Sequence, residues 1–578
     1  MSGKGGPTHN VTLPGALWDE LLALKKSNPA FCVNPRSFIL AATQHRILAV
    51  LRARAECELA DSSPQNIGAS ELAMIPTPMG VESASMILDA IGNAGSTGIT
   101  AKQLASVTGI SADLVDARLE TLSKGRNIAK FGRGLWVLNR YANASTLGSS
   151  QRGASWYDSE FESTYGIKIG RYAGDIQFGP NEKLPVHRWW PYVQGFSAEF
   201  VAGVCNRYHI ANGSTVLDPF CGSGTVPVVA RSLGAKAIGI DMMPIVAFVS
   251  DAKCEWDADP GALLETAQAV INNRAEPTLQ PPFLRETPKH FQPGVLRALL
   301  RLKQNIGAVP DGPVRKLLRL AFSSILIESS NLKRAPCLGY AKKAIRGGDS
   351  AYLLFEQAVA KIADDLRTLN KQRSSWGPPA EITAGNAGVQ RIPSASVDLA
   401  ITSPPYVNGM DYPTNYKIEL AWLDFVDSYE RLAELRASMV ACDNIPRRTA
   451  VDHRPSEAVQ ADEWVASVTS SIGRNIRTKG AYRRVDMPEI VRKYFDDLVP
   501  VIRNVLTALK PGGRFVVVNG DSLIAGTYIP GDMIFARLAA NSGFEVESFD
   551  VARTRRSGQR RAYVLRESVL TLKKPAAC

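Results

Sequence analysis

The sequence predicts a doubly wound α/β protein that carries helical insertions and follows a smaller, separate domain. Short apolar runs, each ending in a Gly, Asp or Ser turn, alternate with helical patterns in the second half of the chain. Buried parallel strands have this continuous apolar composition, and the helices between them cross over and cover both faces of one sheet. The runs occur at 214–220, 235–241, 381–385, 397–403 and 513–520.

The composition of the 578-residue chain argues against a disordered protein, because 45% of its residues are hydrophobic and 21% are charged. No apolar stretch reaches the roughly 18 residues of a membrane span, and the N-terminal residues do not resemble a signal peptide. The eight cysteines are scattered without CxxC spacing, which predicts a reducing cytosol and neither a disulfide framework nor a structural zinc. The formal charge of +12 is compatible with a polyanionic partner.

The first 142 residues divide into two parts. Residues 1–80 are predicted to be a helical segment followed by a linker rich in Pro, Gly and Ser. Residues 81–142 predict three short helices, with Thr100 and Ser111 as N-caps of the second and third, and then two strands. This order resembles a winged helix-turn-helix domain, which contacts either DNA, through its third helix and wing, or another protein.

The rest of the chain is predicted to be one interrupted α/β body. Residues 143–184 have little periodicity and are expected to form a surface connection. The body itself should comprise 185–254 and 379–578, with a helical insertion at 255–378. A polar, basic and loop-rich insert is expected at 426–486.

A glycine-rich turn follows the first strand of this body. The strand runs into Asp218, the turn contains Gly222 and Gly224, and a helix follows. The glycines allow the backbone to approach a ligand closely, and the next strand ends in Asp241, where an acid can accept hydrogen bonds from ribose hydroxyls. An acid just before the glycines suits a cationic ligand better than a pyrophosphate.

The turn, DPFCGSGT at 218–225, resembles motif I of the DNA methyltransferases that modify exocyclic amino groups. The resemblance implies a seven-stranded Rossmann-like sheet that binds S-adenosyl-L-methionine (SAM). It also implies that Phe196 and Ser197 contact the methionine moiety and that Met242 lies over the adenine. Asn386 stands where the family commonly has Asp, although its amide can still bond the adenine amino group. The residues to which the resemblance assigns cofactor contacts are Phe196, Ser197, Asp218, Phe220, Gly222, Gly224, Thr225, Asp241, Met242 and Asn386.

A tetrapeptide at the end of a later strand points to the reaction. The strand 397–402 runs directly into Ser403, Pro404, Pro405 and Tyr406, which match the (D/N/S)PPY motif IV of the same family. Oxygen acceptors that hold both N–H groups of a base amino group stabilise the charge that the nitrogen gains during attack. The Ser403 oxygen and the Pro404 carbonyl can serve as these acceptors, and the prolines fix their direction. Tyr406 offers a face on which a flipped base can stack.

The identity of the target atom and of the base-reading element is less closely defined. A serine in the first position of the tetrapeptide favours cytosine N4, and adenine N6 is the alternative. Asn519, Asp521 and Ser522 follow the fifth strand and either line the base pocket or stabilise a turn. Both inserts are basic and either reads bases or presents a solvated face. The arginines near the C-terminus are expected to contact phosphates: Arg553, Arg555, Arg556, Arg560 and Arg561.

Three rival functions remain. Carbon-5 cytosine methylation needs a Cys nucleophile after Pro, and Pro336-Cys337 lies within a predicted helical insertion. An RNA amino-methyltransferase shares both motifs, although the winged helix and Ser403 favour DNA. A DNA-binding regulator with an inactive body is the third. The sequence thus predicts a site-specific DNA methyltransferase of the prokaryotic, nucleoid-associated cytoplasm, with double-stranded DNA and a restriction or defence system as partners, and with no membrane or metal.

Overall fold

The computed structural model divides the chain into two units, 1–79 and 80–578. The first unit, and with it the predicted helical segment and linker, lies outside the described residues. The structure describes residues 86–87, 90–91, 99–124, 128–131, 135–138 and 153–576, except for 193–194, 335–336, 342–346, 372, 443–444, 447–449, 451, 480–483 and 557–562.

The segment 86–138 has a small core of its own. Its elements are β1 (Ile99–Thr100), α4 (Ala101–Thr108), α5 (Ala112–Lys124), β2 (Ile128–Phe131) and β3 (Leu135–Leu138), and the antiparallel strands lie in the order β1-β3-β2. Thr100 caps α4 in a reciprocal capping box with Gln103, as expected, and α5 begins directly after Ser111. The turn between β2 and β3 lies outside the described residues, so contact with DNA remains a prediction.

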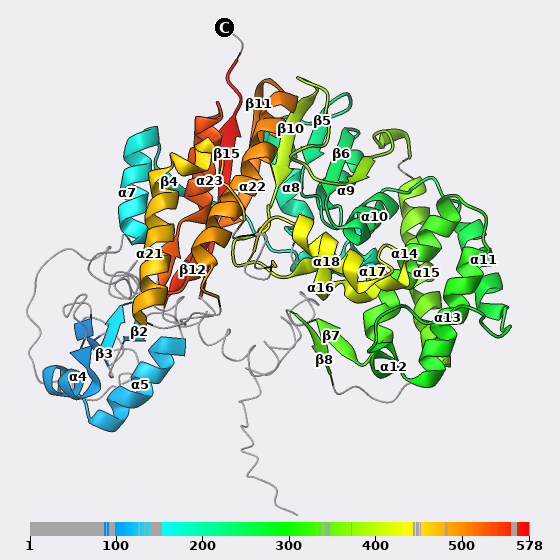
Figure 1. Ribbon diagram of the computed structural model, residues 1–578, viewed down its shortest axis with the longest axis horizontal. Coiled ribbons are helices and arrows are strands. Elements are labelled where there is room, and N and C mark those ends of the chain that lie inside the picture. Colours follow the sequence, from blue (N-terminus) through cyan, green and yellow to red (C-terminus); the bar gives the residue numbers. More distant parts are fainter. Residues whose placement is uncertain are drawn as a thin grey trace, which may run out of the picture. The chain divides into compact units, whose positions relative to one another are not determined.

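The α/β body is built on an eight-stranded sheet in the order β4-β14-β15-β11-β10-β5-β6-β9 (Figure 1). The five expected strands form its parallel part, and β15 runs antiparallel to both β11 and β14. The sheet strands are β4 (Ile169–Arg171), β5 (Thr215–Asp218), β6 (Lys236–Asp241), β9 (Glu381–Ala384), β10 (Val397–Thr402), β11 (Leu509–Gly520), β14 (Glu545–Arg556) and β15 (Val564–Lys573).

The sheet has one strand more than expected, because 143–184 is not only a surface connection. Helix α7 (Ala154–Tyr165) buries Tyr157 and Phe161 in the core, and β4 pairs with β14 in parallel. Tyr157, Phe161 and Tyr165 follow at intervals of four residues, which is the helical signal in a segment otherwise without periodicity.

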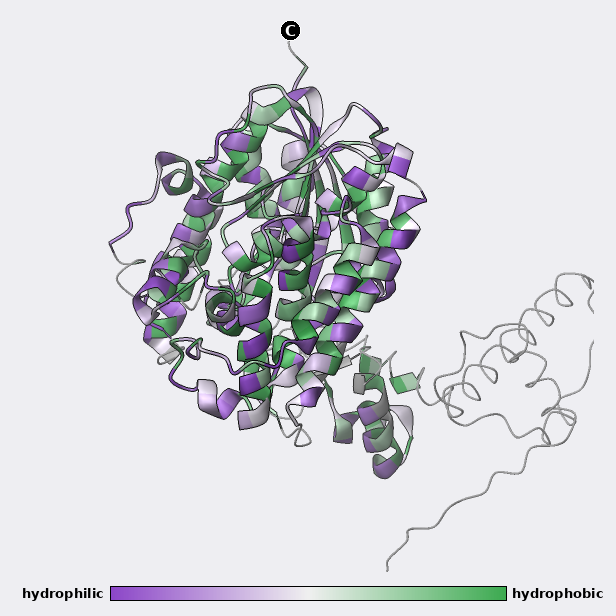
Figure 2. Cartoon of the chain, turned by 90° about the vertical axis from the view of Figure 1, so that its right-hand side faces the viewer, coloured by the Kyte–Doolittle hydropathy of each residue, from purple (hydrophilic) through white to green (hydrophobic). Residues whose placement is uncertain are grey.

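Alternating side chains of the central strands enter two different cores. Phe515 and Val517 of β11 face the core beneath α22 (Met487–Ala508) and α23 (Gly531–Asn541), whereas Val516 and Val518 face α8 (Ala198–Arg207) and α9 (Thr225–Ser232). Hydropathy colouring shows hydrophobic strands and inward helix faces, with hydrophilic residues toward the outside (Figure 2). Because both faces of the sheet are covered, a ligand is expected at the carboxyl ends of its strands.

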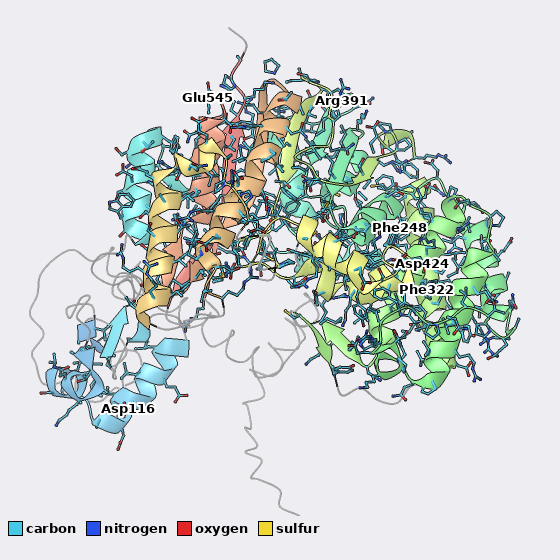
Figure 3. All side chains as sticks on the ribbon, in the orientation of Figure 1. Asp116, Phe248, Phe322, Arg391, Asp424 and Glu545 are labelled. Carbon is cyan, nitrogen blue, oxygen red and sulfur yellow. The ribbon has the colours of Figure 1, made fainter. Side chains whose placement is uncertain are left out.

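The expected helical insertion forms a third core with α10 (Pro244–Lys253). Its helices are α11 (Pro260–Asn272), α12 (Thr287–His290), α13 (Pro293–Gly307), α14 (Pro313–Ser329) and α15 (Asp349–Asn370). Phe248 of α10, Phe322 of α14 and Asp424 lie close together where the insertion meets α17 (Lys417–Trp422) (Figure 3). Asp424 forms an ion pair with Lys303 of α13, with 2.6 Å between Oδ1 and Nζ.

The second insert, 426–486, is more regular than expected. It contains α18 (Tyr429–Ser438), α20 (Glu457–Gln460) and the 17-residue α21 (Glu463–Lys479). The inward face of α21, with Trp464, Val468 and Ile472, is buried against the body. The polar residues between these positions mask the helical period in the sequence, and for this reason the segment is expected to be loop-rich.

No helix among the described residues combines the length and the apolar composition that a membrane span requires.

Asp365 of α15 ties the insertion to the segment that precedes the glycine loop. Its carboxylate accepts hydrogen bonds from the Val186 backbone N–H (2.9 Å), the Trp189 indole (2.8 Å) and Arg188. Val186 adopts a φ of 67°, an unfavourable conformation for a β-branched residue, which these contacts hold in place.

Replacing Asp365 should therefore destabilise the protein. Asp365→Ala leaves several buried donors without an acceptor, and we expect a loss of about 2–4 kcal/mol in the free energy of unfolding, measured by denaturant titration. The neighbouring Asp364 forms only an exposed pair with Arg367, so Asp364→Ala is the matched control and should change stability by less than about 0.5 kcal/mol. Equal losses in both variants would contradict the assigned role.

Candidate functional site

The glycine loop connects β5 to α9 in a conformation that requires glycine. Gly222 and Gly224 have φ values of 49° and 88°. A Cβ at Gly224 would lie 2.7 Å from the Ser250 hydroxyl and 2.9 Å from the Ser250 Cα, so no other residue fits. A Cβ at Gly222 would lie 3.1 Å from the ring of Tyr192.

Two carboxylates hold this loop in place. Asp241, at the end of β6, accepts hydrogen bonds from the backbone N–H groups of Gly222 and Met243, both at 2.9 Å. Asp218, at the end of β5, accepts one from the Phe220 N–H (3.0 Å) and one from the Thr402 hydroxyl (2.7 Å). Thr402 ends β10, so the second acid links the loop directly to the next strand.

The two acids are held at unusual pKa values. Burial raises the pKa of Asp218 to about 7, and the nearby Asp241 adds to the rise. Burial likewise raises the pKa of Asp241 to about 6. A cation or a set of hydroxyl donors beside them would favour the ionised carboxylates, which is the chemistry of an aminoacyl sulfonium that also carries a ribose.

The loop opens into a cleft at the carboxyl ends of the strands. Nine of the predicted site residues line the cleft: Phe196, Asp218, Phe220, Gly222, Thr225, Asp241, Met242, Ser403 and Pro405. The structure therefore brings the glycine loop and the Ser-Pro-Pro-Tyr loop together on one cleft.

The other predicted cofactor residues do not line the cleft. Ser197 caps α8, where its Oγ accepts from the Phe200 N–H and donates to the Asp175 carbonyl. Gly224 is the N-cap residue of α9 and lies against Ser250. Asn386 is exposed, and its Oδ1 accepts a 2.8 Å hydrogen bond from the Gly388 N–H, so its contact with an adenine remains a prediction.

Sequence reasoning missed several lining residues. Tyr192 and Gly195 come from the stretch before Phe196, and Tyr412 follows the catalytic tetrapeptide; their closeness to recognised motifs was the available signal. Met439 and Val440 come from the second insert, and no local pattern indicates their position. Cys221 also lines the cleft, but burial keeps the pKa of its thiol well above its usual value, in agreement with a packing role.

The Ser-Pro-Pro-Tyr loop combines a half-exposed front with a buried support. Ser403 and Pro405 face the cleft, and the Pro405 carbonyl accepts a 2.9 Å hydrogen bond from the Tyr494 hydroxyl. Tyr406 does not line this cleft, and the Arg555 guanidinium lies 5.9 Å from the centre of its ring. Burial raises the pKa of the Tyr406 phenol well above its usual range. The phenol is therefore neutral, and it is the ring that is available for contact.

Asn519 lies within β11, and Asp521 and Ser522 follow the end of this strand. Asn519 and Asp521 are buried, and Asp521 accepts from the Tyr528 hydroxyl and the Arg566 backbone N–H. The Ser522 hydroxyl is within 3.0 Å of Asn408 in the catalytic loop. None of the three lines the cofactor cleft, and neither does Tyr406, so the choice between turn stabilisation and a base pocket stays open.

Two of the C-terminal arginines form ion pairs within the protein, and the contacts of this cluster with phosphates remain a prediction. Arg553 and Arg555 both pair with the buried Glu567, and Arg555 also donates to the Asp521 carbonyl. Their charges are therefore partly neutralised within the protein. Arg560 and Arg561 lie outside the described residues.

Carbon-5 methylation finds no support in this geometry. Cys337, the candidate nucleophile for carbon-5 methylation, is exposed on a hairpin and does not line the cleft. Within the ranges that the structure describes, no group of His, Cys, Asp and Glu is arranged to hold a metal ion.

The strand order, the glycine loop after β5 and the acid that ends β6 define the class of Rossmann-like, SAM-dependent methyltransferases. The sequence model of the N6_N4_Mtase family, described as DNA methylase, matches residues 203–247. This match and the relatives described below support the DNA amino-methyltransferase family for this chain, and they support SAM as its cofactor.

Two curated relatives cover most of the chain. The Type II methyltransferase M.AvaI of Nostoc sp. PCC 7120 is 26% identical over 446 residues, which span 69% of this chain and 89% of that protein. M.BsoBI of Geobacillus stearothermophilus is 23% identical, over 69% and 88%. Among solved structures, a SAM-dependent methyltransferase of Methanosarcina mazei is 11% identical with a TM-score of 0.22, over 65% of this chain and 98% of that one.

The raised pKa values of the two acids predict that SAM binds more weakly as the pH falls below about 7. The ligand favours both ionised carboxylates, so binding must release protons wherever these groups are protonated in the free protein. Calorimetry in two buffers of different ionisation enthalpy should detect this release near pH 6. Asp241→Asn should bind SAM more weakly and reduce the release; an affinity that is independent of pH would contradict the prediction.

The same shifts act on stability with the opposite sign. Unfolded carboxylates lose their protons near their ordinary pKa of 3.8, before the buried ones do. These two groups therefore lower the free energy of unfolding as the pH rises from 3.8 to about 7. The increase in Tm on adding excess SAM should accordingly be larger at neutral than at acidic pH.

Proposed function

We propose that the protein transfers the methyl group of SAM to an exocyclic amino group of a base in DNA, with cytosine N4 as the preferred target. The observation that carries the proposal is the position of Ser403, which lines the same cleft as Asp218, Gly222 and Asp241. When bound, SAM supplies an electrophilic methyl group on a sulfonium. The amino group must then be held opposite that methyl by the protein.

The tetrapeptide is suited to hold such an amino group. Among the described residues none donates to the Pro404 carbonyl, whereas the Pro405 carbonyl is already engaged by Tyr494. The Ser403 oxygen and the Pro404 carbonyl thus remain as acceptors, and two successive prolines restrict the backbone that carries them. Acceptors fixed in advance stabilise the positive charge on the nitrogen better in the transition state than in the ground state.

The target base has to leave the double helix to reach this loop, and Tyr406 offers the stacking surface. In the protein alone the Arg555 guanidinium lies over this ring, held by Glu567 and the Asp521 carbonyl. A cation and a base compete for the same aromatic face, so we infer that Arg555 moves aside when a base enters.

The choice of cytosine N4 rests on the serine in the first position of the tetrapeptide, and adenine N6 is the alternative. The names of the relatives, Type II methyltransferases, support a site-specific enzyme that is paired with a restriction endonuclease. RNA methylation and a DNA-binding role with an inactive body are less favoured, because the acids, glycines and tetrapeptide that the reaction needs are all present.

Mass spectrometry of nucleosides tests the base and the atom together. DNA of mixed sequence is incubated with the protein and SAM that carries a labelled methyl group, and then digested. We expect labelled N4-methylcytosine; labelled N6-methyladenine would select the alternative. Label in RNA alone, or in no nucleic acid, would contradict the proposal.

Tyr406→Ala should lower kcat/KM by roughly five- to 150-fold, the equivalent of about 1–3 kcal/mol of stacking, while SAM affinity stays close to that of the unmodified protein. Tyr406→Phe keeps the ring and is the matched control. If Tyr406→Ala loses SAM binding and activity together, or if Tyr406→Phe is equally impaired, the stacking role is wrong.

Ser403→Ala removes one acceptor and should lower kcat by about 10²–10³-fold, the usual effect of losing one preorganised hydrogen-bond partner of a transition state. Calorimetry with SAM should give an affinity close to that of the unmodified protein. An unchanged kcat would assign the attacking amino group to a different acceptor.

A further inference from the structure

A small hairpin of the helical insertion lies beside the catalytic loop. It consists of β7 (Leu332–Arg334) and β8 (Leu338–Tyr340), which pair antiparallel after the end of α14. In Figure 1 it lies at the lower edge of the α/β body. The parallel strands end on this lower side, since the antiparallel β15 runs upward to the C-terminus.

The hairpin is anchored to the helices that directly follow Ser-Pro-Pro-Tyr. The Arg334 guanidinium donates to both carboxylate oxygens of Glu419, at 2.7 and 2.9 Å, and to the Asn415 carbonyl. The Leu338 backbone N–H donates to Asn415 Oδ1. Glu419 is buried in α17, and Asn415 ends α16 (Tyr412–Asn415). A buried ion pair of this kind, in which one guanidinium nitrogen donates to both carboxylate oxygens, fixes the hairpin relative to the catalytic loop.

The outer surface of the hairpin is aromatic and basic. Tyr340 is 58% exposed, and its ring lies 5.9 Å from that of His290. Lys333 is exposed on β7, and Lys289 is exposed on α12. The backbone carbonyl of Lys289 accepts a hydrogen bond from the side-chain amide of Asn331. Within the described part of the chain, neither lysine forms an ion pair. By contrast, Lys303 and Lys316 of the same insertion pair with carboxylates.

The second insert is a weaker candidate for this surface. Its longest helix, α21, uses Trp464, Val468 and Ile472 to close the protein core. The outer face of the hairpin is exposed and is not part of the protein core. A two-stranded ribbon fits the major groove of duplex DNA.

We propose that the β7–β8 hairpin contacts duplex DNA beside the flipped base, with Lys333 and Lys289 at phosphates and Tyr340 in the groove. The inference rests on the proposed function and assigns target contact to the first insertion. Lysines at phosphates add affinity that falls with salt, whereas an aromatic side chain in the groove contacts base edges and methyl groups.

Cys337 provides a direct test because its thiol is exposed within the hairpin, while the other cysteines that the structure describes are buried. The full-length protein is alkylated with iodoacetamide, with and without saturating duplex DNA, and the rate at Cys337 is followed by peptide mass spectrometry. We expect DNA to slow this reaction several-fold, and SAM alone to leave it unchanged. An unchanged rate while anisotropy shows bound DNA would overturn the proposal.

Variants of the surface give a second readout. Lys333→Ala should weaken binding of duplex DNA by roughly three- to tenfold and reduce the slope of log K against log salt concentration by about one. Lys361→Ala, at an exposed lysine of α15, is the matched control and should change neither quantity. If the unmodified protein methylates DNA, and Lys333→Ala and Tyr340→Ala bind duplex DNA as tightly as it does, the hairpin contact alone is wrong. If the unmodified protein never methylates DNA, the proposed function itself is wrong.

Discussion

The hydrogen bond from the Thr402 hydroxyl to Asp218 Oδ1, 2.7 Å long, joins the ends of two neighbouring parallel strands. Asp218 begins the glycine loop, and Thr402 is followed directly by Ser403. β5 and β10 lie where the strand order of the sheet changes direction, which leaves their carboxyl ends open between diverging crossovers. A buried carboxylate needs a hydrogen-bond donor such as this hydroxyl. The same contact therefore satisfies Asp218 and holds the glycine loop against the Ser-Pro-Pro-Tyr loop.

Much of this arrangement could be predicted from local sequence. The strands that end at Asp218, Asp241 and Thr402 are continuous apolar runs, and a parallel sheet buries such runs on both faces. A glycine turn and a Pro-Pro pair restrict the backbone by themselves, without help from distant residues. The residues of these loops that line the cleft were therefore identifiable before their neighbours were known.

The parts that sequence reasoning missed depend on contacts between distant segments. Strand β4 is three residues long and exists because β14 offers it an edge. Met439 and Val440 reach the cleft only because α18 folds back beside the catalytic loop. Arg553 is basic like many phosphate ligands, yet Glu567 occupies it on the adjacent strand. Local composition contains none of this information, because each case is decided by which partner the fold brings close.

The insertion belongs to the construction of the cleft and is not an appended module. Tyr192, which lines the cleft, packs with Trp190 and Tyr416, with ring centres 5.5–6.2 Å apart and ring planes inclined by 27–29°. The Arg334 guanidinium of the hairpin lies 4.2 Å over the ring of Tyr416 and extends this stack outward. Buried Lys253 donates to the carbonyls of His187 and Trp190 and fixes the inner end. The hairpin is therefore joined to the wall of the cofactor cleft by continuous packing, from Arg334 through Tyr416 to Tyr192.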